Sequence, residues 1–142
     1  VDHILQRYHN VHRAQFEELV PLAQKVAQVH ADTFPAEIAE LLAYMQNELL
    51  MHMMKEERML FPMINQGVGR GAAMPISVMM HEHEEHDRAI ARLKELTDNF
   101  QAPEGACGSW TRLYALAKEM VEDLNDHIHL ENDILFARVL DS

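Results

Sequence analysis

Four long stretches of the chain repeat apolar residues with the period of an α-helix. They span approximately 2–30, 36–66, 73–100 and 109–140, and they are rich in Ala, Leu, Glu, Met and Lys. Turn-forming residues separate them at Asp32–Pro35, at 67–71 and at 103–109. None of the stretches has the alternating pattern of a strand. The sequence therefore predicts an all-α protein, an antiparallel up-down four-helix bundle with short connections.

Three residues predict where individual helices begin or are interrupted. Pro35 lies where a proline favours the start of the second helix, and Ser109 is a suitable N-cap for the fourth. Pro21 interrupts the first stretch, where it should kink or break the helix.

Each predicted helix carries ionisable groups on the face that should be buried. These groups, in chain order, are His9, His12, His30, Glu48, His52, Glu56, His83, His86, Asp87, Asp123, His127 and Glu131. Burying an unpaired carboxylate costs several kcal/mol, which is comparable with the whole stability of a domain. The groups must therefore satisfy each other or be neutralised, and a di-metal site in the bundle core would do this.

The strongest signal is an internal repeat. Residues 52–61 and 127–136 both read His, three residues, Glu, three residues, Leu-Phe. Glu48 and Asp123 each precede the histidine by four positions. A spacing of four places His and Glu one turn apart on the same helix face, so both side chains can reach one metal pair.

A helix with an inward histidine precedes each repeat, so the chain reads as two similar helical hairpins. The predicted metal ligands are His9, His52, Glu56, His83, His127 and Glu131. Nitrogen and oxygen donors without thiolate suit iron or manganese, and bridging carboxylates favour a di-iron centre. We expect two iron ions with an oxo or hydroxo bridge.

The sequence suggests a division of these ligands between the two ions. His9 and His52 would hold one iron, His83 and His127 the other, and the two glutamates would bridge them. One coordination position then stays open on each ion. Adjacent open positions are suited to small diatomic molecules.

The remaining acidic and imidazole groups are assigned by helical phase and height. Glu48 and Glu82 are predicted catalytic residues that either hydrogen-bond a ligand imidazole or pass protons toward the open positions. Glu57 is expected on the solvated face and His81 in solvent, whereas His86, about 60° from His83, should lie beside the site. His12 and His30 are expected to lie away from the metal pair along the helix axis; their roles stay open.

Composition limits the class of protein. The 142 residues suit one domain, and a formal charge of −11 argues against nucleic acid or an anionic membrane as partner. A single cysteine, Cys107, excludes an internal disulfide and suits a reducing compartment. No apolar stretch approaches the roughly 20 residues of a membrane span. We expect a cytoplasmic protein; its oligomeric state stays open.

The chain resembles haemerythrin-like domains and, more narrowly, the repair-of-iron-centres family. The resemblance covers nearly the whole chain and is carried by Asp2-His3-Ile4, Arg7-Tyr8-His9, Val29-His30-Ala31-Asp32, His52-Met53-Met54-Lys55-Glu56-Glu57, Leu60-Phe61-Pro62-Met63-Ile64, Pro75-Ile76-Ser77-Val78-Met79 and Leu130-Glu131-Asn132. Members of that family usually carry a small N-terminal domain with a Cys pair. Residues 1–142 are therefore expected to be one di-iron domain, the C-terminal domain of a longer protein.

The resemblance implies repair of iron–sulfur clusters damaged by nitric oxide or oxidants. Iron donation to damaged iron–sulfur proteins and reduction of nitric oxide to nitrous oxide are both consistent with it. The alternative is an oxygen-binding or oxygen-sensing haemerythrin-like module. Oxygen carriers of that family have a His-x3-His pair on the third helix and end with His-x4-Asp. This chain has Asp87 and Asn132 at those positions, which weakens the alternative.

Overall fold

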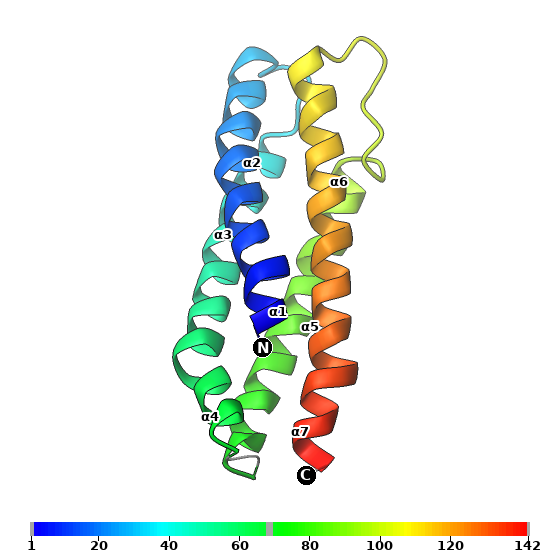
Figure 1. Cartoon of the computed structure of the whole chain (residues 1–142). Helices are drawn as coiled ribbons and strands as arrows, with labels where there is room; N and C mark the ends of the chain where they lie inside the picture. The colour runs from blue at the N-terminus through cyan, green and yellow to red at the C-terminus, as the bar shows by residue number, and fades with distance from the viewer. Residues whose placement is uncertain (1, 68–69, 142) are drawn as a thin grey trace.

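The computed structural model describes residues 2–67 and 70–141, which form four helical rods packed side by side (Figure 1). The first rod consists of α1 (Asp2–Ile4), η1 (Leu5–His9) and α2 (Asn10–Val29), and the second of α3 (Ala36–Lys55), η2 (Glu56–Leu60) and α4 (Phe61–Asn65). A short turn, η3 (Arg70–Ala72), leads into α5 (Ala73–Leu96), the third rod. The fourth contains α6 (Gly108–His129), η4 (Leu130–Phe136) and α7 (Ala137–Asp141).

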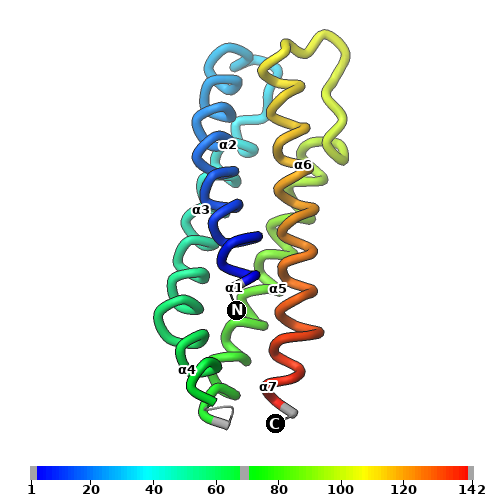
Figure 2. The backbone as a smooth tube through the Cα atoms, in the orientation of Figure 1, coloured from blue at the N-terminus to red at the C-terminus, as the bar shows by residue number. Residues whose placement is uncertain are grey.

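Successive rods run in opposite directions, as the tube in Figure 2 shows. Helix α2 packs against α3 and α6, and α3 also packs against α5. This arrangement confirms the predicted all-α, up-down four-helix bundle. Among the described residues, no helix is long and apolar enough to cross a membrane.

The rods contain three π-helical segments that the sequence analysis did not predict. Segment η1 ends at His9, η2 begins at Glu56, and η4 contains Glu131. An α-helical period of about 100° per residue cannot reveal such a segment, because π-helix adds a residue to the turn. All three coincide with predicted metal ligands, in line with the tendency of π-helical turns to occur at functional sites.

Two predicted helix features differ in the structure. Cys107, rather than Ser109, caps α6, because its Sγ accepts a hydrogen bond from the backbone N–H of Trp110 at 3.4 Å. Helix α2 continues through Pro21 without a break. Pro35, in contrast, precedes the first residue of α3 as predicted.

The third helix ends at Leu96 and not near residue 100. The Thr97 hydroxyl donates a hydrogen bond to the Leu93 carbonyl at 2.8 Å and accepts one from the Phe100 N–H at 3.0 Å. Residues 98–100 then have φ angles of 51°, 58° and 64°. This left-handed run turns the chain away from the helix axis. The spacing of apolar residues gives no sign of such a turn.

The buried apolar side chains form two separate clusters. The larger cluster includes Phe16, Leu42, Leu113 and Met120 and fills most of the bundle. The smaller cluster consists of Ile4, Leu60, Phe61, Ala72, Ile76, Met79 and Phe136. Along every rod, the predicted metal ligands lie between residues of these two clusters. The bundle therefore has a polar layer enclosed by apolar layers.

Replacing Leu113, which is fully buried in the larger cluster, by Ala should lower the free energy of unfolding by about 2–5 kcal/mol, because the substitution leaves a cavity. Leu140→Ala, at a position that is 48% exposed, should change it by less than about 0.5 kcal/mol. Urea unfolding followed by circular dichroism measures both. Equal effects of the two substitutions would contradict the assignment of the core.

Candidate metal centre

The six predicted ligands meet in the polar layer of the bundle. His9, Glu56, His127 and Glu131 form one cluster, with one ligand atom from each residue within 4.8 Å of the others. His52, Glu56, His83 and Glu131 form a second cluster by the same measure. Both glutamates belong to both clusters, and all six residues are at most 2% exposed. The arrangement provides two adjacent four-ligand sites that share two carboxylates.

The structure divides the histidines differently from the sequence-based expectation. His9 lies with His127, and His52 lies with His83, so each cluster combines histidines from both hairpins. The reason is tertiary: α2 packs against α6, and α3 packs against α5. The expected pairs, His9 with His52 and His83 with His127, are therefore wrong.

All four imidazoles turn Nε2 toward the carboxylates. Glu56 Oε1 lies 3.2 Å from His9 Nε2 and 3.4 Å from His52 Nε2. Glu131 contacts the other two histidines, with Oε1 2.9 Å from His83 Nε2 and Oε2 3.1 Å from His127 Nε2. Each carboxylate is thus placed between two imidazoles, as a bridging ligand would be.

A partner outside the clusters holds Nδ1 of every one of these histidines. His9 Nδ1 lies 2.7 Å from Glu57 Oε2, and His52 Nδ1 lies 2.8 Å from Glu82 Oε1. A carboxylate can only accept, so each Nδ1 carries the proton and Nε2 keeps its lone pair for the interior. This is the orientation that a metal-binding imidazole needs.

The other two histidines have uncharged partners. His83 Nδ1 donates to Asn132 Oδ1 at 2.8 Å. His127 Nδ1 lies 3.2 Å from His12 Nε2, and His12 Nδ1 lies 3.0 Å from Gln15 Oε1. A proton on His12 Nδ1 leaves its Nε2 free to accept from His127. Hence all four Nε2 atoms can present lone pairs to the centre.

Aromatic rings from the two repeats cover the imidazoles. Phe61 stacks on His9 with ring centroids 5.6 Å apart, and Phe136 stacks on His83 at 6.1 Å. Both phenylalanines end the Leu-Phe pair of their repeat, so the repeat encodes ligands and the apolar cover together. Tyr8 stacks on His127 at 5.1 Å. These rings exclude water from the centre.

The two central carboxyl groups titrate differently. Burial, reinforced by the neighbouring Glu131 carboxylate, raises the pKa of Glu56 well above its usual value. Burial also acts to raise the pKa of Glu131, but the adjacent imidazoles of His127, His52 and His83 outweigh it and lower that pKa. Two buried carboxylates in contact thus resist simultaneous ionisation, a conflict that bound cations would remove.

Unpaired polar atoms show that these residues fit a metal pair. His9 Nε2, His127 Nε2 and both oxygens of Glu56 and of Glu131 are buried without a hydrogen-bond partner among the described residues. Leaving buried polar atoms unpaired is costly and uncommon. Nitrogen and oxygen donors converging from four helices are the ligands that iron or manganese takes.

Comparisons with known proteins agree with this geometry. Residues 1–139 match the family model described as the hemerythrin HHE cation binding domain. The chain belongs to this family. It is 94% identical to the iron-sulfur cluster repair protein DnrN of Neisseria gonorrhoeae over all of this chain and 90% of that protein.

More distant relatives carry a similar name. The chain is 50% identical to the iron-sulfur cluster repair protein YtfE of Pectobacterium atrosepticum and 47% identical to that of Salmonella newport, over 99% of this chain in both cases. It spans 64% of the length of these YtfE proteins. The resemblance inferred from the sequence motifs is confirmed.

Three residues that support this haemerythrin-type centre were missed or misplaced by the sequence analysis. Glu57 was expected on a solvated face, but it bonds His9 and is held by Arg13 at 2.8 Å. His12 was expected away from the metal pair, but it contacts His127. Asn132 was noted only as a departure from oxygen carriers. Asn132 directly follows Glu131, as Glu57 follows Glu56, and this matching position in the two repeats was the sequence signal that could have found both residues.

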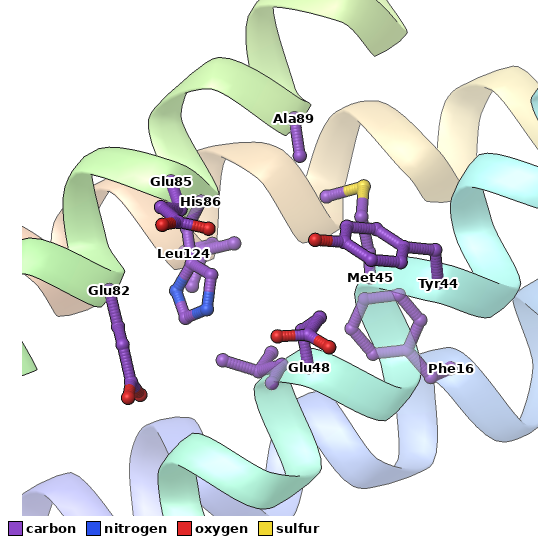
Figure 3. Close-up of a pocket in the computed structure, with 10 residues that line it drawn as sticks. Phe16, Tyr44, Met45, Glu48, Glu82, Glu85, His86, Ala89 and Leu124 are labelled. Carbon is purple, nitrogen blue, oxygen red and sulfur yellow. The ribbon is translucent and has the colours of Figure 1, made fainter.

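The two predicted catalytic carboxylates have different surroundings. Glu82 bonds His52 Nδ1 and also Lys55 Nζ, at 2.8 Å each. The bond to His52, opposed by burial and reinforced by Lys55, lowers the pKa of Glu82 to about 2. It therefore stays ionised and suits orienting His52. Glu48 instead faces a cavity beside the centre (Figure 3), without a hydrogen bond or ion pair to any described residue.

Three further histidines, His30, His81 and His86, differ in how close they lie to the centre. His81 is exposed and contacts Glu85, and His30 packs against Trp110 at the other end of the bundle. His86 is buried beside His52, with ring centroids 5.0 Å apart. Only His86 of these three adjoins the centre.

Several buried imidazoles have lowered pKa values. Burial, together with the charge of His127, lowers the pKa of His9 and of His12 to about 4. Burial, with the charges of His52 and His83, lowers that of His86 to about 3. These rings are neutral in the folded protein at neutral pH.

Acidification should therefore destabilise the metal-free protein. Between pH of about 6.5 and about 4, unfolded histidines bind protons that His9, His12 and His86 cannot bind in the fold, so stability falls as the pH falls. At pH 5 the loss is about 2 kcal/mol for each such histidine. Urea unfolding at pH 7.5 and pH 5 measures it, with His12→Gln expected to reduce the slope. A stability independent of pH in this window would contradict the burial of neutral imidazoles.

Proposed function

We propose that this protein repairs iron–sulfur clusters damaged by nitrosative or oxidative stress, using a non-haem di-iron centre. His9, His127, His52 and His83 would each bind iron through Nε2, and Glu56 and Glu131 would bridge. The names of the DnrN and YtfE relatives support this function. The observation that carries the proposal is the buried layer of four imidazoles around two carboxylates whose oxygens have no hydrogen-bond partner among the described residues.

The chain's own residues would prepare this centre in three ways. Glu57, Glu82, Asn132 and His12 hold the four imidazoles in one tautomer and one orientation. Such outer hydrogen bonds commonly contribute about 10- to 100-fold to metal affinity. Phe61, Phe136 and Tyr8 cover the rings and limit access of water. The helices make the site rigid, because the ligands come from all four rods.

Two modes of repair are compatible with such a centre. In the first, iron is cargo and passes from the protein to a damaged cluster. In the second, coupling two nitric oxide molecules to nitrous oxide and water consumes two electrons and two protons, and two bound ferrous ions would supply the electrons. Glu48, a carboxylate without a described partner at the cavity, would deliver protons in this mode.

The oxygen-binding alternative is less well supported. Asp87, where oxygen carriers have a histidine, is exposed to solvent and turned away from the polar layer. Asn132, where they have an aspartate, is occupied by its hydrogen bond with His83. The two extra ligands that such carriers use are therefore not provided by these positions.

Replacing either bridging glutamate, in Glu56→Leu or Glu131→Leu, should abolish binding of the metal pair, because each carboxylate serves both clusters. Helicity should persist, since Leu suits a buried helical position. Elemental analysis with circular dichroism checks this, and Glu84→Leu on the exposed side of α5 is the matched control. Two irons per chain in either bridging variant would contradict the assignment.

Wild-type protein purified without oxygen should contain two irons per chain and consume nitric oxide. Glu48→Gln should keep the iron content but slow nitric oxide consumption by about a hundredfold, the usual scale for loss of a proton-transfer group. Glu84→Gln is the control. An unchanged rate would remove Glu48 from the proton route, and reversible oxygen uptake by the wild type would favour the alternative function.

A transfer assay would separate the two modes. Iron-loaded protein should restore the activity of a damaged iron–sulfur enzyme and lose a stoichiometric amount of its own iron if donation is the mode. Restoration without loss of iron would favour the nitric oxide mode. No restoration by either route would contradict the proposed function.

A further inference from the structure

A chain of hydrogen bonds runs from the metal centre to the surface between the first and fourth rods. His127 Nδ1 lies 3.2 Å from His12 Nε2, and His12 Nδ1 lies 3.0 Å from Gln15 Oε1. The amide Nε2 of Gln15 donates to Asp123 Oδ2 at 2.8 Å, and Arg7 donates to the other carboxylate oxygen, Oδ1, at 2.9 Å. The chain thus joins a buried ligand of the centre to an ion pair whose arginine is 45% exposed.

The direction of these hydrogen bonds is decided at the surface end. A carboxylate accepts and an amide nitrogen donates, so Asp123 holds the amide of Gln15 with its nitrogen outward and its oxygen toward His12. The amide oxygen can only accept, so it places a proton on Nδ1 of His12 and leaves Nε2 of that ring as the acceptor. His127 then donates through Nδ1, and its Nε2 keeps the lone pair that a metal needs.

A second group attracts the proton of His127 the other way. Glu131 Oε2 lies 3.1 Å from His127 Nε2, so this carboxylate favours a proton on the inner nitrogen. With a proton on Nε2, His127 would have no lone pair for a metal, because its other nitrogen faces His12. The chain to Asp123 therefore opposes an inner hydrogen bond that would close the site.

The immediate partner of His127 does not decide this competition by itself. Carboxylates hold His9 and His52 directly, and a carboxylate only accepts. His12, in contrast, can carry its proton on either ring nitrogen, so its contact alone leaves both tautomers of His127 open. The deciding group lies farther out, and Asp123 is the first side chain along the chain that can only accept.

The position of Asp123 suits this role. It precedes His127 by four residues in α6, and Gln15 follows His12 by three residues in α2, so each pair lies about one turn apart on its helix. The side chain of Asp123 is 13% exposed, and both of its oxygens have partners. Its hydrogen bonds are therefore largely shielded from water, which restricts the amide of Gln15 to one orientation.

We propose that Asp123 is a positioning residue of the metal centre. Acting through Gln15 and His12, it keeps the proton of His127 on Nδ1. The cluster that contains His9 and His127 thereby stays open to a metal, although neither Asp123 nor Gln15 belongs to a cluster. The consequence for iron rests on the proposed function, whereas the place of the proton is a property of the metal-free protein.

Nitrogen NMR of the metal-free protein at pH 7.5 tests the place of the proton directly. The nitrogen chemical shifts of an imidazole distinguish the protonated atom from the atom with the lone pair. In the wild type, His127 should carry its proton on Nδ1. Gln15→Leu should move it to Nε2 in most molecules, because nothing then opposes Glu131. Asp123→Asn should give a mixture, because an asparagine amide can turn either its oxygen or its nitrogen to Gln15.

Iron binding without oxygen, measured by competition with a ferrous chelator, tests the consequence for the centre. Gln15→Leu should weaken the binding of one of the two ions by about tenfold, the lower end of the effect of losing an outer hydrogen bond. Gln15→Glu should restore most of this affinity, because its carboxylate still accepts from His12 Nδ1. A merely space-filling role predicts the reverse, since a second carboxylate beside Asp123 adds repulsion between like charges.

A matched control lies next to the proposed residue. Glu122 is exposed on α6 and directly precedes Asp123. Glu122→Gln removes one carboxylate from the same turn of the helix, so it should keep the tautomer of His127 and the iron affinity of the wild type. Circular dichroism and thermal unfolding confirm that each variant is folded.

A proton on Nε2 of His127 in the wild type would overturn the proposal. So would one and the same tautomer in the wild type, Gln15→Leu and Asp123→Asn, or an equal loss of iron affinity in Gln15→Leu and Gln15→Glu. Failure of the proposed function has a different signature. The wild type would then bind no iron, yet the proton would still lie on Nδ1 and would still move to Nε2 in Gln15→Leu.

Discussion

The structure depends on burying six ionisable side chains in one layer of a four-helix bundle. Apolar clusters lie on both sides of this layer, and the carboxylate oxygens of Glu56 and Glu131 have no hydrogen-bond partner among the described residues. A buried charge without a partner costs several kcal/mol, which is a large part of a domain's stability. The fold tolerates the layer because its imidazoles and carboxylates face each other and together form a donor set suited to cations.

A second layer of hydrogen bonds, outside the six side chains, fixes the orientation of the four histidines. The two hairpins are related by an internal repeat, yet they hold their histidines by different means. Glu57 and Asn132 follow the two glutamates that both clusters share, and they bond histidines of the preceding helices. Because Glu57 carries a carboxylate and Asn132 a neutral amide, the two hairpins are not equivalent. Each cluster thus has one histidine backed by a carboxylate and one backed by a neutral group.

The difference between the two halves also explains why His86 faces the cavity. His12 and His86 lie three residues after His9 and His83, at corresponding places of the two halves. His12 bonds His127, whereas the matching position on His52 is taken by Glu82, which precedes His83. His86 is therefore left without that bond and faces the cavity.

Much of this could be predicted from the sequence, because helical period and turn residues are local properties. The four helices, the bundle, and the six side chains of the central layer follow from spacing along each helix. What local spacing cannot supply is contact between helices: His12 meets His127 from 115 positions away, and Glu57 meets His9 from 48. The division of histidines into clusters, the π-helical turns and the free imidazole of His86 arise from packing. Spacing along each helix places the six side chains of the central layer on buried faces. Which of them meet is set by the packing of the helices, because contacts across the bundle depend on which helices become neighbours.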